Sequence, residues 1–227
     1  MLRATKGRGR SGEAPRAPGP RADYERAEGA DPVKGWWARA KYYDQLTGVF
    51  SISRRYFVIG AFDGALTVLG LIIGAAGHST DAGLILAAGF ATCVALAVSS
   101  MFGAYEAERV EQDIEHQELQ VAMLRKVGGD KVAAHRFATV VSSIVHGVGP
   151  LVAGLLPLVP FLVVPSLLSF GDAVLAAAVI TLAFLFALGV FLGTLTRRNL
   201  AVAGLRLVVV AILTAALTVL IGGHSVF

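Results

Sequence analysis

The sequence contains one cysteine, Cys93, and little charge for its length. A single cysteine excludes an internal disulfide and any metal site built from several cysteines. Charged residues make up 16% of the chain, whereas a soluble domain carries about a quarter. Hydrophobic residues make up 55% of the 227 residues, and the mean hydropathy is +0.66. These values exclude an ordinary soluble domain and predict an all-α membrane protein with several spans.

Among the segments outside the apolar runs, three contain no lysine or arginine: the connections at 78–82 and 165–172 and the tail after 222. Of the 20 basic residues, 19 lie before residue 56, in the 105–137 connection or in the 196–199 turn. With five spans, every one of these segments falls on one side of the membrane, as the positive-inside rule requires. We therefore expect a cytoplasmic N-terminus and an external C-terminus. Such a basic flank orients a membrane protein, so we expect no nucleic-acid partner.

Five apolar runs are each long enough to cross about 30 Å of hydrocarbon. The predicted spans are about 56–77, 83–104, 138–164, 173–195 and 200–222. Because proline removes a backbone donor and kinks a helix, the third run is expected to be broken or tilted by its prolines. These are Pro150, Pro157, Pro160 and Pro165.

The chain divides into an N-terminal arm, residues 1–50, and a five-span domain, residues 51–227, with a Glu-rich cytoplasmic connection at 105–137. The first part of the arm is rich in Arg, Gly and Pro and is expected to be disordered. Residues 33–50 mix Trp and Tyr with Lys and Arg, which is typical of an interfacial segment; a linker with incidental aromatics is the alternative. Pairs of glycines four residues apart suggest close helix packing or a homodimer without deciding between them. They are Gly60/Gly64, Gly70/Gly74 and Gly189/Gly193.

Asp63 is the only ionisable side chain in the first span other than the terminal tyrosine. A carboxylate inside a membrane helix costs roughly 2.5–3.5 kcal/mol on insertion scales, so it indicates a functional site. It lies about 10 Å from the cytoplasmic end of its span. In one interpretation Asp63 pairs with Arg206, which lies about 9 Å deep in the fifth span. In the other it binds a cation that crosses the membrane and exchanges it for a proton.

Two further side chains lie in the cytoplasmic half of the membrane. His146, about 12 Å deep in the third span, is either a cation ligand and proton carrier or a hydrogen-bonding residue between helices. Met101, about 5 Å deep beside Ser99 and Ser100, is either a soft ligand or packing.

Acidic residues are concentrated directly after the second span. Glu108, Glu111, Glu115 and Glu118 step by 3, 4 and 3, so on a continuing helix they share one face. Oxygen ligands suit divalent cations such as Mn(II), and Fe(II) accepts them as well. The stripe is either a cation-gathering surface or a solvated acidic face.

Several stretches, in this order, resemble the vacuolar iron transporter family, including its prokaryotic members. They are GAFDGALTVLGLIIG, Ser100-Met101 running into EAERVEQDIEHQE, GLLPLVPFL and AGLRLVVVAILTAALTVLIG. The resemblance implies five spans, a homodimer with the ion path between protomers, and Fe(II) or Mn(II) export coupled to protons. It points to Asp63 and Met101 as metal ligands in the membrane and to the four glutamates as ligands after the second span.

The chain departs from the family's plant-type members in its cytoplasmic connection. Only about 33 residues, 105–137, stand where those members carry a longer metal-collecting domain. We expect a multi-pass protein of the cell membrane that is not an enzyme, holds no tightly bound cofactor and transports Fe(II) or Mn(II). The alternative from another class is a membrane protein that senses or buffers metal without transporting it. An intramembrane enzyme using Ser99, Ser100 and His146 lacks the glycine-framed serine turn.

Overall fold

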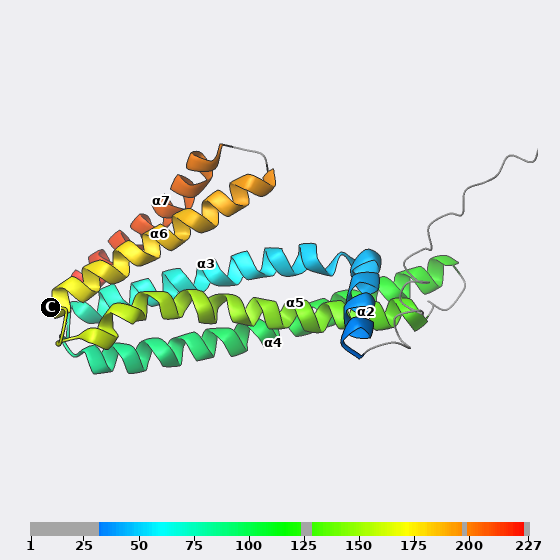
Figure 1. The fold of residues 1–227 in the computed structure, drawn as a ribbon, viewed down its shortest axis with the longest axis horizontal. Helices are drawn as coiled ribbons and strands as arrows, with labels where there is room; N and C mark the ends of the chain where they lie inside the picture. The colour runs from blue at the N-terminus through cyan, green and yellow to red at the C-terminus, as the bar shows by residue number, and fades with distance from the viewer. Residues whose placement is uncertain (1–31, 124–128, 197–198, 225–227) are drawn as a thin grey trace, which may run out of the picture.

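The computed structural model describes residues 32–123, 129–196 and 199–224, and every regular element in these ranges is helical (Figure 1). The elements are α2 (Pro32–Thr47), α3 (Val49–Ala76), α4 (Ala82–Met123), α5 (Gly129–Leu155), the 3-10 helix η1 (Leu156–Val163), α6 (Phe170–Thr196) and α7 (Leu200–His224). Five segments are long and apolar enough to cross a membrane: α3, most of α4, α5 with η1, α6, and α7. The all-helical class and the number of spans are therefore confirmed.

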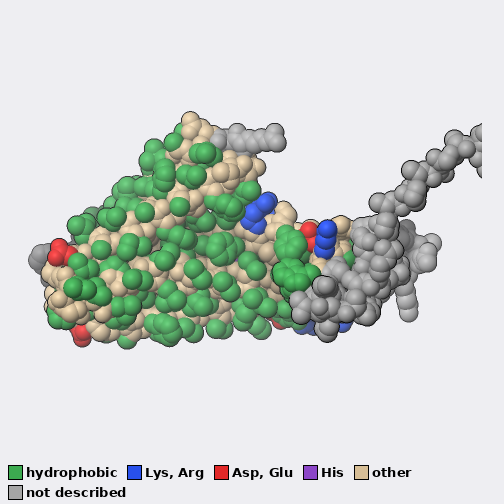
Figure 2. All heavy atoms as spheres, viewed as in Figure 1, with side chains coloured by type: hydrophobic (Ala, Val, Ile, Leu, Met, Phe, Trp, Pro, Cys, Tyr) green, Lys and Arg blue, Asp and Glu red, His purple; other side chains and the backbone are tan. Residues whose placement is uncertain are grey.

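The spans form two groups that meet at one end of the molecule. Helices α3, α4 and α5 run side by side, and α3 and α5 make the most extensive contact. The α6–α7 pair joins them at the end where α3 turns into α4, and diverges from α3 toward the other end (Figure 1). We call that other end the basic end, after Arg54, Arg55, Arg109 and Arg136. On the face shown in Figure 2, hydrophobic side chains cover most of the body; acidic side chains appear at the left end, and basic ones lie from just right of the centre toward the basic end.

Helix α2 lies across the bundle at the basic end (Figure 1). Gly48 allows the sharp change of direction into α3, because its φ of 66° is in the left-handed region that favours glycine. Asp44 accepts a hydrogen bond from the backbone N–H of Phe50 (2.9 Å), which supports the start of α3. Trp36 and Trp37 are 52% and 60% exposed. The interfacial role of residues 33–50 stays a prediction, and residues 1–31 lie outside the described ranges.

The third span changes its helical form at its prolines. The α-helix contains Pro150 and ends at Leu155, where a 3-10 helix that contains Pro160 takes over. Proline has no N–H to donate, so Pro150 leaves the carbonyl of His146, one turn earlier, without its helical partner. The interruption that the prolines predict is therefore present.

The paired glycines pack helices of the same chain. A Cβ on Gly64 would lie 2.4 Å from the Cα and carbonyl oxygen of Pro150, so only glycine allows α5 this close to α3. A Cβ on Gly189 would lie 2.6 Å from the carbonyl oxygen of Ala203 in α7. The Cβ positions of Gly70 and Gly74 are in ordinary contact with Thr218 of α7. The glycine pairs thus have partners within one protomer.

Candidate functional site

Tyr56 joins three helices near the basic end. Its hydroxyl, on α3, donates a hydrogen bond of 2.7 Å to Glu108 Oε1 on α4. Its main-chain oxygen lies 2.9 Å from His146 Nδ1 on α5, and the two rings are 5.0 Å apart. Arg55 lies over the tyrosine ring, with the guanidinium carbon 5.5 Å from its centre. This cluster places a carboxylate, a phenol and an imidazole together where α3, α4 and α5 meet.

The hydrogen bond to Tyr56 fixes the proton on the His146 ring. A carbonyl oxygen can only accept, so Nδ1 must carry the hydrogen. In the neutral ring the lone pair therefore lies on Nε2, which can accept a proton or bind a cation. The carbonyl of His146, freed by Pro150, points at α3, since a Cβ on Gly60 would lie 2.6 Å from it. The predicted His146 site is therefore a ring held in one orientation against α3.

Asp63 lies on an exposed part of α3 within its span. It makes no hydrogen bond or ion pair with any residue that the structure describes, and Arg206, which is also exposed, makes none either. Asp63, Gly70 and Gly74 are spaced by 7 and 4, so they share one face of α3. That face contacts Thr218 of α7 at Gly70 and Gly74. Asp63 therefore lies on the same face of α3 as this contact, about two turns closer to the basic end than Gly70, and its side chain is exposed.

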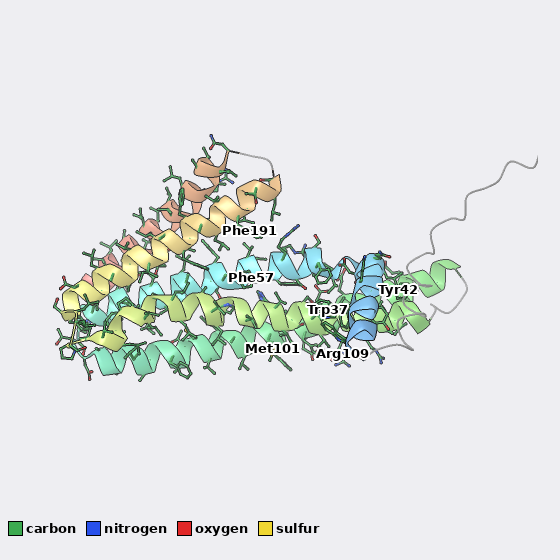
Figure 3. All side chains as sticks on the ribbon, viewed as in Figure 1. Trp37, Tyr42, Phe57, Met101, Arg109 and Phe191 are labelled. Atoms are coloured by element: carbon green, nitrogen blue, oxygen red, sulfur yellow. The ribbon has the colours of Figure 1, made fainter. Side chains whose placement is uncertain are left out.

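Met101 lies at a different seam from Asp63. A Cβ on Gly147 of α5 would lie 2.9 Å from the Met101 Cβ, so Met101 sits where α4 crosses α5. Figure 3 shows it on α4, about two turns before Arg109. Its side chain is 39% exposed. Within one protomer, therefore, Met101 and Asp63 contact different residues.

The glutamate stripe extends the inner face of α4 beyond the membrane. Helix α4 is continuous over Ala82–Met123, as a shared face for the glutamates requires. The buried residues Cys93 and Ala104 belong to the same 3-and-4 series that continues through Glu108, Glu111, Glu115 and Glu118. Glu108 is half-buried against Tyr56, whereas the other three are exposed. Within the described ranges no three His, Cys, Asp or Glu side chains converge as a metal site.

Sequence reasoning missed two polar links between helices. Tyr56 and Glu108 are 52 residues apart, and no local pattern pairs them. Gln112 Nε2 donates to the carbonyl of His135 (3.1 Å) and to the hydroxyl of Thr139, which ties α4 to α5 beyond the membrane. The sequence offered one signal for the second link: Gln112 is an uncharged polar residue within an otherwise acidic segment of α4.

Comparison with known proteins identifies the family of this chain. A model of the VIT family matches residues 54–127 and 118–223, which include nearly all of the five spans and the whole glutamate stripe. An uncharacterized protein of Methanocaldococcus jannaschii is 34% identical over 171 residues, covering 74% of this chain and 87% of that protein. The matched region holds the open carboxylate of Asp63, the Tyr56 cluster and the continuous α4. This chain belongs to the VIT family, a family of membrane metal-ion transporters.

Proposed function

We propose that this protein exports Fe(II) or Mn(II) from the cytosol across the cell membrane in exchange for protons. Membership of the VIT family supports metal-ion transport in general. The choice of metal rests on the ligands, because carboxylates and imidazole suit both ions. The direction rests on the basic residues, which orient the basic end toward the cytosol under the positive-inside rule.

The observation that carries the proposal is the open carboxylate of Asp63 inside a membrane-spanning helix. A buried charge with a structural role is expected to be paired. Asp63 has no hydrogen-bonding or ionic partner within the described part of the chain, so a cation is the natural counter-charge. A carboxyl group binds either a proton or a metal ion. The two carboxylate oxygens can therefore bind a metal ion from one side of the membrane and release it when a proton binds from the other side.

The glutamate stripe supplies the entry. Three exposed carboxylates on one face of α4 raise the local concentration of cations at the basic end. The stripe ends at Glu108, beside Tyr56 and the His146 ring. The path we propose therefore runs from the stripe past Glu108 toward Asp63, with His146 Nε2 as the proton acceptor. A second copy of the chain against the open face of α3 would bring two Asp63 carboxylates together, as expected for a homodimer.

Transport by reconstituted protein tests the proposal. Proteoliposomes that hold a metal-sensitive dye and a proton gradient should show Fe(II) or Mn(II) flux with the wild-type chain and none with Asp63→Asn. Asp172→Asn is the matched control, since Asp172 is an exposed acid in the first turn of α6, where it hydrogen-bonds to Ser169. Full flux in Asp63→Asn would refute the role of Asp63. Metal binding that needs Glu111 and Glu115 but gives no flux in any gradient would favour the sensing or buffering alternative.

A further inference from the structure

A second polar feature lies at the basic end, on a groove between α4 and α5. Its walls carry Arg109 from α4 and Arg136 from α5, and its volume is about 580 Å³. The other residues that line it are Tyr105, Gln112, Asp113, Val132, Thr139 and Val140. On α4, Tyr105 and Arg109 lie about 60–160° around the helix from Glu108 and Glu111, so the groove is separate from the glutamate stripe.

The groove is a built feature rather than a gap between side chains. Gln112 closes its floor by donating to the His135 carbonyl and the Thr139 hydroxyl across the α4–α5 seam. Thr139 in turn donates to the same carbonyl (3.1 Å). These bonds hold the two walls together and therefore fix the spacing of the two arginines.

The charge of the groove favours an anion. Two guanidinium groups and one carboxylate, that of Asp113, line it. Arg109 has a weak contact with Glu106 at 3.9 Å along its own helix, and Arg136 has no ion pair with any described residue. Guanidinium groups on opposite walls can grip the two free oxygens of a phosphate, which is the geometry that arginine recognises best.

An apolar track leads from the groove toward the membrane. Val98, Phe102, Tyr105 and Arg109 are spaced by 4, 3 and 4 on α4, and Arg136, Val140 and Ile144 by 4 and 4 on α5. Phe102 is 63% exposed and Ile144 is 49% exposed, as expected for lipid-facing side chains of spanning segments. Figure 3 shows Arg109 at the level at which α2 crosses the bundle, which is the predicted headgroup layer. Polar groups at that level, above an exposed apolar track, match the two parts of a phospholipid.

We propose that this groove binds an anionic phospholipid from the cytoplasmic leaflet. Its phosphate lies between Arg109 and Arg136, the Tyr105 hydroxyl donates to it, and an acyl chain follows Phe102, Val140 and Ile144. Basic pockets between spans on the cytoplasmic side are known to take such headgroups. A soluble phosphate would use only the polar half of the groove, which is why we commit to a lipid. The bound lipid would brace α4 against α5 beside Gln112, and this proposal does not depend on metal transport.

Binding to the purified full-length chain tests the proposal. The chain in neutral detergent is titrated with phosphatidylglycerol, with phosphatidylcholine of the same acyl chains, and with glycerol phosphate. Phosphatidylglycerol should bind and raise the thermal midpoint, whereas the other two should not. Arg109→Gln combined with Arg136→Gln should weaken phosphatidylglycerol binding at least about tenfold for each arginine. Lys41→Gln combined with Arg206→Gln removes the same charge elsewhere and should leave binding unchanged.

Four results would overturn the proposal. Equal binding of the two lipids would show that the groove does not distinguish an anionic from a zwitterionic headgroup. Equal binding of glycerol phosphate would assign the groove to a soluble anion. Disulfide cross-linking between protomers through Val140→Cys in membranes would show that a second copy covers the groove. If the double glutamine variant does not fold, Arg109→Gln and Arg136→Gln are measured as single variants, and unchanged phosphatidylglycerol binding in both would also overturn the proposal.

Discussion

Replacing Gly64 by alanine tests the packing that positions the site. The added Cβ would lie 2.4 Å from the Cα and carbonyl oxygen of Pro150, whereas non-bonded carbon atoms prefer about 3.5–4.0 Å. Because the atoms in the way are backbone, no rotamer change relieves the clash, and α3 and α5 must separate by roughly 1 Å. Overpacking of this kind costs about 1–3 kcal/mol, against a gain of about 1 kcal/mol from the better helix propensity of alanine. Because backbone atoms cannot rotate out of the way, the cost lies in the upper part of this range, about 2–3 kcal/mol, which leaves a net loss of about 1–2 kcal/mol.

The measurement is the thermal midpoint of the detergent-solubilised chain. A loss of about 1–2 kcal/mol should lower the midpoint by about 2–8 °C in a chain of this size. Gly103→Ala is the matched control, since a Cβ there has no atom within 4 Å, and Gly70→Ala is a second control on α3, where the nearest atom is 3.7 Å away. Both controls should unfold at or above the wild-type temperature. If Gly64→Ala unfolds with the controls, the close approach of α3 and α5 is refuted.

Three further predictions concern the two polar links between helices and the glutamate stripe. Tyr56→Phe removes the hydrogen bond to Glu108 and should lower the thermal midpoint by about 2–4 °C, because a bond to a charged group is worth about 1 kcal/mol or more. Gln112→Leu leaves the His135 carbonyl without this donor and should speed amide hydrogen exchange in residues 132–140, read by mass spectrometry, with slow exchange retained at the far end of α5. Glu111→Gln with Glu115→Gln should raise the metal concentration needed for half-maximal flux about tenfold while leaving the maximal flux unchanged; an unchanged half-maximal concentration would refute the entry role of the stripe.

The sequence predicts which faces of the helices matter better than it predicts what those faces contact. Length and hydropathy suffice for five spans, and the 3-and-4 spacing of the glutamates suffices to place them on one face of α4. The partner of Gly64 could not be predicted, since a small residue at helical spacing indicates close approach by some helix but does not identify α5. The link between Tyr56 and Glu108 could not be predicted either, because it depends on how far α4 is shifted along α3. Periodicity carries no information about that shift.

Continuity of α4 has a mechanical consequence. Its 42 residues form a rod about 63 Å long without a proline or a break at the membrane surface. Glu118 at the outer tip and Met101, which packs against Gly147, therefore belong to one stiff body. A small rotation imposed at the outer tip turns Glu108, Met101 and Cys93 by the same angle, because no hinge lies between them to absorb it. A rotation that cation binding imposed on the acidic surface would therefore reach the contact between α4 and α5 undiminished.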